Sequence, residues 1–430
     1  MTAGEELYKL VAELYPICRS ITGDGVRSTL EIVDREVGGG LEVSEVPSGT
    51  PVLDWTVPRE WNVRDAWVAD PSGRKVIDFQ ASNLHLVSYS VPVRATVSLA
   101  ELKEHLFTLP DHPDWIPYRT SYYAERWGFC ASQRLVDSLP EGDYQVCVDS
   151  TLADGHLTYG ERVVEGQTDE EVLVSCHVCH PSLANDNLSG IAVASRLARL
   201  LGQGPRPRYR YRFLFIPGTI GSITWLARNS EPVGRVRHGL VLSGVGDPGG
   251  FTWKRSRRGD TEIDRVVAHV LGRSGRDHQL LDFSPYGYDE RQYCSPGFNL
   301  PVGRLSRTPF ATYPEYHTSA DDLDLVGPAQ LQESLEVCQE IVRVLEANRR
   351  YLNLSPMGEP QLGRRGLYGQ IGGRSDAEER QMAMLWVLNL SDGDSSLLDV
   401  AERAGLPFAQ VADVAGALEE AGLLSRTAGG

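Results

Sequence analysis

The densest group of chemically active side chains lies in CHVCHPSLANDNLSG, residues 176–190, which holds two histidines, two cysteines and an aspartate. His177, His180 and Asp186 supply imidazoles and a carboxylate within one short stretch. These are the ligand types that hold a catalytic divalent metal while leaving a coordination position open for water. Two such histidines alone are more often a turn residue and a core residue, so the prediction of half a metal site depends on the aspartate.

The neighbours of these ligands decide between a catalytic site and simpler alternatives. Asn185 and Asn187 flank the aspartate and can orient its carboxylate. Cys176 and Cys179 match a CxxC pattern, which also occurs in structural zinc sites and in redox proteins. The sequence contains no second CxxC or CxxH pair and no thioredoxin-like helix start, so we give both alternatives low weight and treat the cysteines as bystanders.

A strand and a helix must position this stretch. EEVLVSCH predicts a strand that ends at His177, with Cys176 facing the core and His177 presented at the strand end. A helix is expected over Gly190 to Leu201. From about residue 140 onward such strands and helices alternate, which predicts an α/β sheet with parallel strands. Ligand sites in these sheets favour the carboxyl ends of the strands.

The rest of the chain predicts three domains. Two amphipathic helices over 4–36, broken at Pro16 and by the turn 22–25, precede short β-prone runs rich in glycine and proline. A long helix is expected from Pro328. We expect a catalytic domain, an inserted β-rich domain and a C-terminal winged-helix domain, at residues 1–38 with 140–355, 39–139 and 370–430 respectively.

The net charge of the chain limits which partners the protein can bind. The formal net charge is −16, which disfavours broad contact with nucleic acid or an anionic membrane. Residues 375–430 carry ten acidic residues against three arginines, so we interpret the predicted winged helix as an element for protein docking or homo-oligomerisation. No signal peptide or long apolar run is visible, and seven thinly spread cysteines suit reduced thiols. These features favour a cytoplasmic protein.

Several segments together resemble one family. HVCHPSLANDNLSG, between a predicted strand and a predicted helix, resembles the zinc-binding segment of the zinc aminopeptidase and carboxypeptidase clan. With YPICRSITGDGVR, IPYRTSYYAERWGFC, YDERQYCSPGFNLPVG and EYHTSADDLDLV, the chain is similar to bacterial aminopeptidase-like proteins, including polysaccharide biosynthesis proteins with an aminopeptidase-like domain. The resemblance implies an α/β fold of the zinc-exopeptidase type: a mixed sheet between helices, with the inserted β-rich domain and the C-terminal winged-helix domain.

The resemblance also implies metal ligands. His177 is similar to the first metal histidine, Asp186 to the carboxylate that holds or bridges metals, and His317 to the last metal histidine. His180 has no counterpart in the better-known aminopeptidases, so metal ligand and substrate contact stay open for it. The clan's other metal aspartate has no clear match, although Asp247 follows a few residues after its expected place. One zinc ion is therefore expected rather than two.

The chain departs from the clan at its general base. The clan has a glutamate where FIPGTIGS places Gly218. General-base catalysis typically contributes about 10²- to 10⁴-fold in rate, so this change matters. Glu290 and Asp289 are the candidate replacements, and Glu290 is the favoured one. Either one of them serves, or peptide hydrolysis is weak or lost.

Four residues are candidates for substrate binding. Arg119 could clamp a carboxylate through its guanidinium, with a structural ion pair as an equal alternative. The others are neighbours of the expected site: Tyr122, Asn187 and Tyr316.

The leading hypothesis is a zinc-dependent metallo-aminopeptidase-like hydrolase that acts on an amide bond of a peptide or amino-acid conjugate. The alternatives are a metal-dependent, non-hydrolytic or amide-modifying enzyme of natural-product or polysaccharide biosynthesis, and a non-catalytic binding protein.

Overall fold

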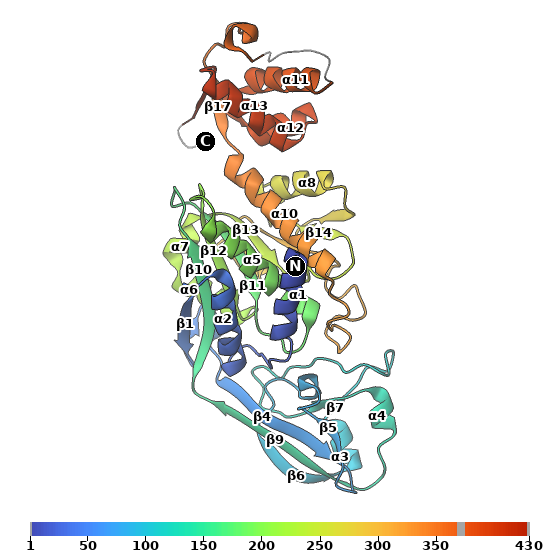
Figure 1. The fold of residues 1–430 in the computed structure, drawn as a ribbon. Coiled ribbons are helices and arrows are strands. Elements are labelled where there is room, and N and C mark those ends of the chain that lie inside the picture. The colour runs from blue at the N-terminus through green and yellow to red at the C-terminus, as the bar shows by residue number, and fades with distance from the viewer. Residues whose placement is uncertain (1, 368–374, 428–430) are drawn as a thin grey trace. The chain divides into compact units, whose positions relative to one another are not determined.

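The computed structural model describes residues 2–367 and 375–427. It contains two compact units, which we describe separately (Figure 1). The first comprises Met1–Asp264 and Asp277–Glu336, and the second comprises Arg265–Arg276 and Val337–Gly430.

Two helices begin the first unit, as the sequence predicts. In α1 (Ala3–Leu14), Thr2 and Glu5 form a capping box, and Leu7, Leu10 and Leu14 are buried. The chain breaks after Pro16 and resumes as α2 (Asp24–Val37), which ends at a left-handed glycine. Both helices pack against α5 (Gly190–Gln203), the helix that follows the predicted metal-binding stretch.

An eight-stranded mixed sheet forms the centre of this unit, in the order β1-β10-β12-β11-β13-β16-β14-β15. The strands β12, β11, β13 and β16 run parallel, whereas β10 and β14 pair antiparallel with their neighbours in this group. The strand bounds are β1 (Glu42–Pro47), β10 (His156–Val164), β11 (Glu171–His177), β12 (Arg210–Ile216), β13 (Val236–Leu242), β14 (Phe251–Lys254), β15 (His278–Leu281) and β16 (Val302–Ser306).

Helices cover both faces of the sheet, which confirms the predicted α/β fold. The helix α5 contacts β10, β11, β12 and β13. Side chains of α6 (Ile220–Arg228) join Leu173, Leu214 and Ile216 in a hydrophobic core on the other face. The short α9 (Glu290–Tyr293) also lies there, because the hydroxyl groups of Tyr293 and Ser175 are 2.9 Å apart. The helix α7 (Ser230–Arg235) also belongs to this unit, and α10 (Pro328–Ala347) begins in it.

A second sheet, in the order β5-β4-β9-β6, forms the β-rich part of the same unit. Trp61 and Tyr89 stack in its core. Its strands and neighbouring short elements are β2 (Pro51–Val52), β3 (Trp55–Thr56), β4 (Glu60–Ala69), β5 (Lys75–Asp78), β6 (Val93–Ser98), α3 (Leu99–Glu104), β7 (Leu106–Phe107), β8 (Phe129–Cys130), α4 (Gln133–Asp137) and β9 (Asp143–Ala153).

The second unit contains the predicted helix-turn-helix. Gly405, in the left-handed conformation, separates α12 (Leu397–Ala404) from α13 (Phe408–Glu420). This unit also contains most of α8 (Glu262–Arg273), together with β17 (Arg350–Asn353), α11 (Ser375–Leu390), β18 (Asp392–Ser396) and β19 (Leu424–Arg426), and the three strands form a sheet. Among the described residues, no helix combines the length and apolar character that crossing a bilayer requires.

Candidate metal centre

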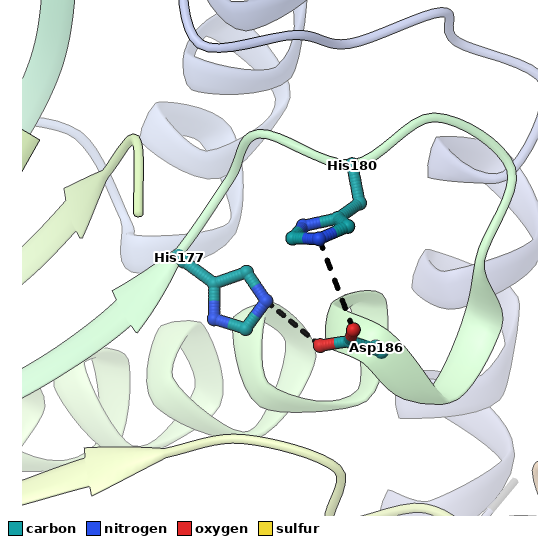
Figure 2. Close-up of side chains that lie close together, drawn as sticks. All are labelled: His177, His180 and Asp186. Carbon is teal, nitrogen blue, oxygen red and sulfur yellow. Dashed lines mark hydrogen bonds and ion pairs between the residues drawn. The ribbon is translucent and has the colours of Figure 1, made fainter. Parts of the chain in front are cut away.

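His177, His180 and Asp186 come together at the carboxyl end of β11 (Figure 2). One potential ligand atom from each lies within 4.8 Å of the others. His177 is the last residue of the strand and 1% exposed, and its Nε2 lies 2.8 Å from Asp186 Oδ1. Ligands about 2.0–2.2 Å from a zinc ion stand no more than about 4.4 Å apart, so this donor set fits zinc after small movements.

His317 reaches the same carboxylate from a distant part of the chain. Its Nε2 lies 3.0 Å from Asp186 Oδ2, and its ring stacks on Tyr316. The backbone of His317 has φ +56°, an uncommon conformation for a residue other than glycine. Backbone hydrogen bonds to the β-rich part hold this loop: Tyr118 N–H donates to His317 O, and Ser319 N–H donates to Ile116 O.

His180 lies between these residues. Its Nε2 is 3.8 Å from Asp186 Oδ2, and its ring centroid is 4.9 Å from that of His177 and 5.1 Å from that of His317. Burial lowers the pKa of His180 well below its usual range, although Asp186 opposes the shift. Burial thus favours the neutral imidazole, which is the form that binds a metal.

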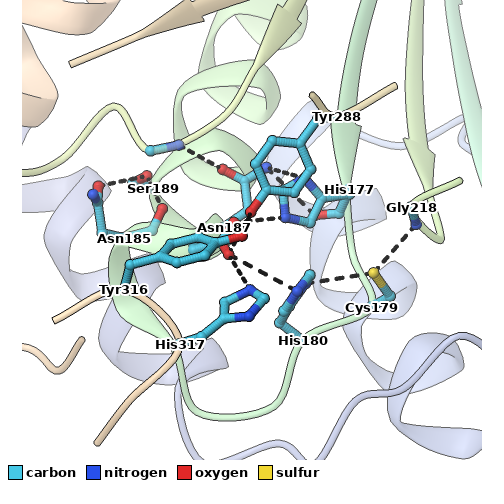
Figure 3. Close-up of polar contacts among 12 residues, drawn as sticks. His177, Cys179, His180, Asn185, Asn187, Ser189, Gly218, Tyr288, Tyr316 and His317 are labelled. Carbon is cyan, nitrogen blue, oxygen red and sulfur yellow. Dashed lines mark hydrogen bonds and ion pairs between the residues drawn. The ribbon is translucent and has the colours of Figure 1, made fainter. Parts of the chain in front are cut away.

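The carboxylate of Asp186 is ionised despite its burial. Desolvation alone would raise its pKa, but the nearby histidines outweigh that effect and lower the pKa well below its usual range. Tyr288 also donates its hydroxyl proton to Asp186 Oδ2 at 2.6 Å, and its ring stacks on His177 (Figure 3). The sequence does not single out Tyr288 on its own, because an aromatic residue in a polar loop carries no such signal.

Asn185 and Asn187 do not donate to the carboxylate of Asp186, so the prediction that they orient it is wrong. Asn187 donates to Leu242 O and accepts from Gly244 N–H, and Asn185 accepts from Gly246 N–H. These bonds tie the turn Ala184–Ser189 to the loop after β13. Asp321 holds the turn from another side, because its two oxygens accept the backbone N–H groups of Asn185 and Asp186.

The two cysteines are buried thiols. Burial raises the pKa of Cys179 to about 12 and that of Cys176 well above its usual range, so both are protonated at neutral pH. Both are free, and Cys176 faces the core as the strand alternation predicts. Neither thiol belongs to the histidine and aspartate cluster.

Gly218 lies beside the cluster. It follows β12, where Ile216 is the register partner of His177, and a Cβ built on it would stand 3.6 Å from His177 Cβ and 3.3 Å from Cys179 Sγ. A side chain at this position would therefore begin beside His177, with only a small movement of the Cys179 sulfur.

The two candidate bases have different surroundings. Asp289 Oδ1 accepts hydrogen bonds from Thr219 N–H at 2.7 Å and Ser222 Oγ at 2.9 Å, beside Gly218. Burial raises the pKa of Asp289, against these hydrogen bonds. The fully buried Glu290 instead forms an ion pair with Lys254, whose Nζ is 2.9 Å from Oε1. Asp289 thus has the closer link to the Gly218 region.

The remaining candidates lie around the site. Arg119 is exposed, whereas its neighbour Tyr118 packs against His180 and His317. Adjacent residues of an extended segment point in opposite directions, and the sequence does not say which one faces the ligands. Tyr122 lies behind Tyr118, with hydroxyl oxygens 3.1 Å apart. Asp247 accepts from Asn185 Nδ2 at 3.0 Å and from Thr308, which links it to the turn.

Comparison with solved structures defines the fold. A zinc aminopeptidase from Bacillus subtilis aligns with TM-score 0.56 and 14% identity, over 79% of this chain and 94% of that one. An aminopeptidase from Aneurinibacillus sp. strain AM-1 aligns with TM-score 0.51 and 14% identity, over 79% and 93%. The chain therefore has an aminopeptidase-like fold.

The family follows from residues 8–348, which match the model described as a domain of unknown function, DUF4910, so the chain belongs to that family. Residues 349–426 match a winged helix-turn-helix model. A Clostridium acetobutylicum protein, described as a proposed polysaccharide biosynthesis protein with an aminopeptidase-like domain, is 50% identical over 421 residues, 98% of this chain and 96% of that one. These matches confirm the resemblance inferred from the sequence.

A crystal structure from Clostridium acetobutylicum, described as that of a proposed peptidase, aligns with TM-score 0.94 and 48% identity. It covers 99% of this chain and 96% of the other. The likeness therefore extends through both units.

Proposed function

We propose that this protein is a zinc-dependent, aminopeptidase-like enzyme that acts on an amide bond of a peptide or an amino-acid conjugate. The observation that carries the proposal is the convergence of His177, His180 and Asp186 within 4.8 Å, with His317 on the same carboxylate. We infer that His177, Asp186 and His317 hold one zinc ion and that His180 is a further ligand. The zinc would polarise an amide carbonyl and favour ionisation of water.

The surrounding side chains would transfer the proton, orient Asp186 and contact the substrate. Asp289, with its raised pKa and its place beside Gly218, is our candidate for the group that takes a proton from the attacking water and passes it to the leaving amine. Tyr288 donates to Asp186 and would keep that carboxylate oriented. Tyr316, Tyr122, Asn187 and Arg119 remain candidates for substrate contact, and Tyr316 is directly linked to Tyr288 at 2.9 Å.

A second candidate function rests on Gly218. Because no carboxylate projects from this position beside His177, the same metal pocket could join or rearrange an amide-containing intermediate without net hydrolysis. The description of the 50% identical relative as a proposed polysaccharide biosynthesis protein favours a biosynthetic substrate. We propose this role as the alternative to hydrolysis.

Metal analysis and one substitution test these proposals. Purified protein should contain about one zinc ion per chain, and a protein unable to bind zinc would refute both enzymatic proposals. Gly218→Glu should fold, because the nearest atom to the new Cβ is the Cys179 sulfur at 3.3 Å. If wild type hydrolyses aminoacyl amides and Gly218→Glu adds nothing, hydrolysis is native. If only the variant hydrolyses them, the biosynthetic alternative is favoured.

A further inference from the structure

A small hollow of about 10 Å³, roughly the room that one water molecule needs, lies beside Asp186. Its walls combine aromatic rings with polar groups from the end of β16, and the residues that concern us are Arg304, Ser306, Tyr288 and Phe310. Arg304 is 2% exposed and Ser306 is 2% exposed. A buried arginine on a central strand is uncommon and needs an explanation.

The pleat of the sheet explains why these polar groups share one face. Arg304 and Ser306 are two residues apart on β16, so their side chains point to the same side. Lys254 on β14 is the register partner of Arg304, and its side chain is also buried. Two cations therefore stand next to each other inside the protein.

These two cations share a single carboxylate. Lys254 Nζ is 2.9 Å from Glu290 Oε1, and Arg304 Nη1 is 3.8 Å from the same oxygen. Among the described residues, Arg304 Nε and Nη1, Ser306 Oγ and the acceptor Glu290 Oε2 have no hydrogen-bond partner, so three unpaired donor atoms stand against one unpaired acceptor in this group. Leaving such groups buried and unpaired is costly, which points to a ligand that supplies acceptors.

The other acid at this hollow does not meet that need. Both oxygens of Asp186 are engaged, Oδ1 by His177 and Oδ2 by Tyr288 and His317. Phe310 meanwhile lies against the guanidinium of Arg304, with the ring centroid 4.6 Å from Cζ. A planar cation held against a ring keeps its N–H groups in a fixed direction.

We propose that Arg304 and Ser306 form a subsite that binds a carboxylate of the substrate beside the proposed metal ligands. The guanidinium N–H groups and the Ser306 hydroxyl would donate to the carboxylate oxygens, an arrangement for which arginine is well suited. The inference rests on the proposed function only in taking the ligand to be the substrate. It implies that the substrate class is acidic, such as a peptide or conjugate of a dicarboxylic amino acid.

Calorimetric titration with succinate, and with its neutral diamide as a matched probe, tests this subsite. Wild type should bind succinate at least about 10-fold more tightly than Arg304→Gln does, both with and without zinc, because a charge-assisted pair is lost. The affinity for succinamide should be the same in the two proteins. Equal affinity of wild type and Arg304→Gln for succinate, or no binding of succinate by wild type, would overturn the proposal.

Arg307→Gln is the matched control. Arg307 is also buried, but its guanidinium is already bonded to Gly249 O and Glu333. This variant should bind succinate like wild type and have a lower Tm, whereas the Tm of Arg304→Gln should fall less, because the ion pair that Arg304 loses, with Glu290, is 3.8 Å long. A large fall in the Tm of Arg304→Gln alone would mark Arg304 as structural and contradict the proposal.

Two further measurements keep the test decisive. If Arg304→Gln fails to fold, Arg304→Lys and Ser306→Ala should each weaken succinate binding, and unchanged binding in both would refute the subsite. If wild type takes up no zinc, the proposed function fails, while the zinc-free titrations still decide the role of Arg304.

Discussion

At the scale of single residues, Asp186 is the centre of the site, because its two oxygens meet three imidazoles and a phenol. The histidines are not equivalent. His317 is closer to the carboxylate but 32% exposed in its side chain, whereas His180 is farther and 12% exposed. Their separate contributions to zinc binding can be measured.

We predict that His177→Ala, His180→Ala and His317→Ala each lower zinc affinity by more than the roughly 10–100-fold typical of losing an outer-sphere partner. Competition with a chromogenic chelator measures this loss. His85→Ala serves as a control, since that histidine bonds to Cys130 O in the β-rich part. Retention of full zinc affinity by His180→Ala would make His180 a substrate contact, the role that the sequence left open for it.

A second prediction concerns Asp289. Burial raises its pKa, so Asp289 takes up a proton at a higher pH than an ordinary aspartate does. Activity that depends on Asp289 as a base should therefore fall at a higher pH when the solution is acidified. Asp289→Asn should lower kcat about 10²- to 10⁴-fold while zinc content stays constant. A pH–rate profile and metal analysis measure both effects.

Ser222→Ala provides the control for this assignment. The Ser222 hydroxyl donates to Asp289 and favours its ionised form, so its removal should move the acidic limb of the profile to higher pH. If Asp289 only holds the start of α6, the limb should stay in place in Ser222→Ala.

Some of these residues could be predicted from sequence and others could not. Residue type and the strand before His177 indicated His177, His180 and Asp186, because all lie in one short stretch. Tyr288 and Arg304 reach the site through tertiary packing, which single-sequence patterns do not encode. The asparagines beside Asp186 have the expected chemistry, but the direction of their side chains depends on the loop after β13.

At the scale of elements, Arg27 connects α2 to strands of two sheets. Its guanidinium makes two hydrogen bonds of 2.8 Å to Glu60 on β4 and one of 2.9 Å to Glu45 on β1. The hydrogen bonds with Arg27 are the largest cause that lowers the pKa of Glu60 to about 2, from an ordinary 4.5.

We predict that this interaction makes stability depend on pH. Because the folded-state pKa of Glu60 is depressed, its contribution is complete above about pH 4.5 and is lost as the pH falls toward 2. Glu60→Gln should lower the free energy of unfolding by about 1–2 kcal/mol near neutral pH and by less near pH 3, allowing for solvent screening. Urea denaturation at both pH values measures the difference.

Glu13→Gln is the matched control, since Glu13 pairs with Arg35 at an exposed position. It should change stability by less than about 0.5 kcal/mol at either pH. A Glu60→Gln effect of equal size at both pH values would contradict the assigned cause.

The helices and strands were largely predictable from the sequence, whereas the pairing of the strands was not. Hydrophobic periodicity indicated α1 and α2, and the sequence also predicted α5, the start of α10 at Pro328 and the C-terminal winged helix. Alternation also indicated strands in the β-rich segment, but it does not specify partners or register. Thus β1 joins the large sheet through β10, whereas β9 joins β4 and β6.

At the scale of the whole molecule, charge distinguishes this chain from proteins that use a winged helix to read DNA. The formal net charge is −16, and residues 375–430 carry ten acidic side chains against three arginines. We predict no measurable affinity for duplex DNA even at about 50 mM salt, where phosphate contacts are strongest. Fluorescence anisotropy with a labelled duplex tests this, and salt-dependent binding would contradict it.

The hydrogen bonds around His317 have a consequence for how the chain folds. His317 and Asp186 are 131 residues apart, and Ser319 and Ile116 are 203 residues apart, so the site is assembled by closing long loops. Contacts between distant residues form slowly. During refolding, the capacity to capture zinc should therefore emerge after most helical signal has returned, and the metal would serve as a reporter of the completed topology.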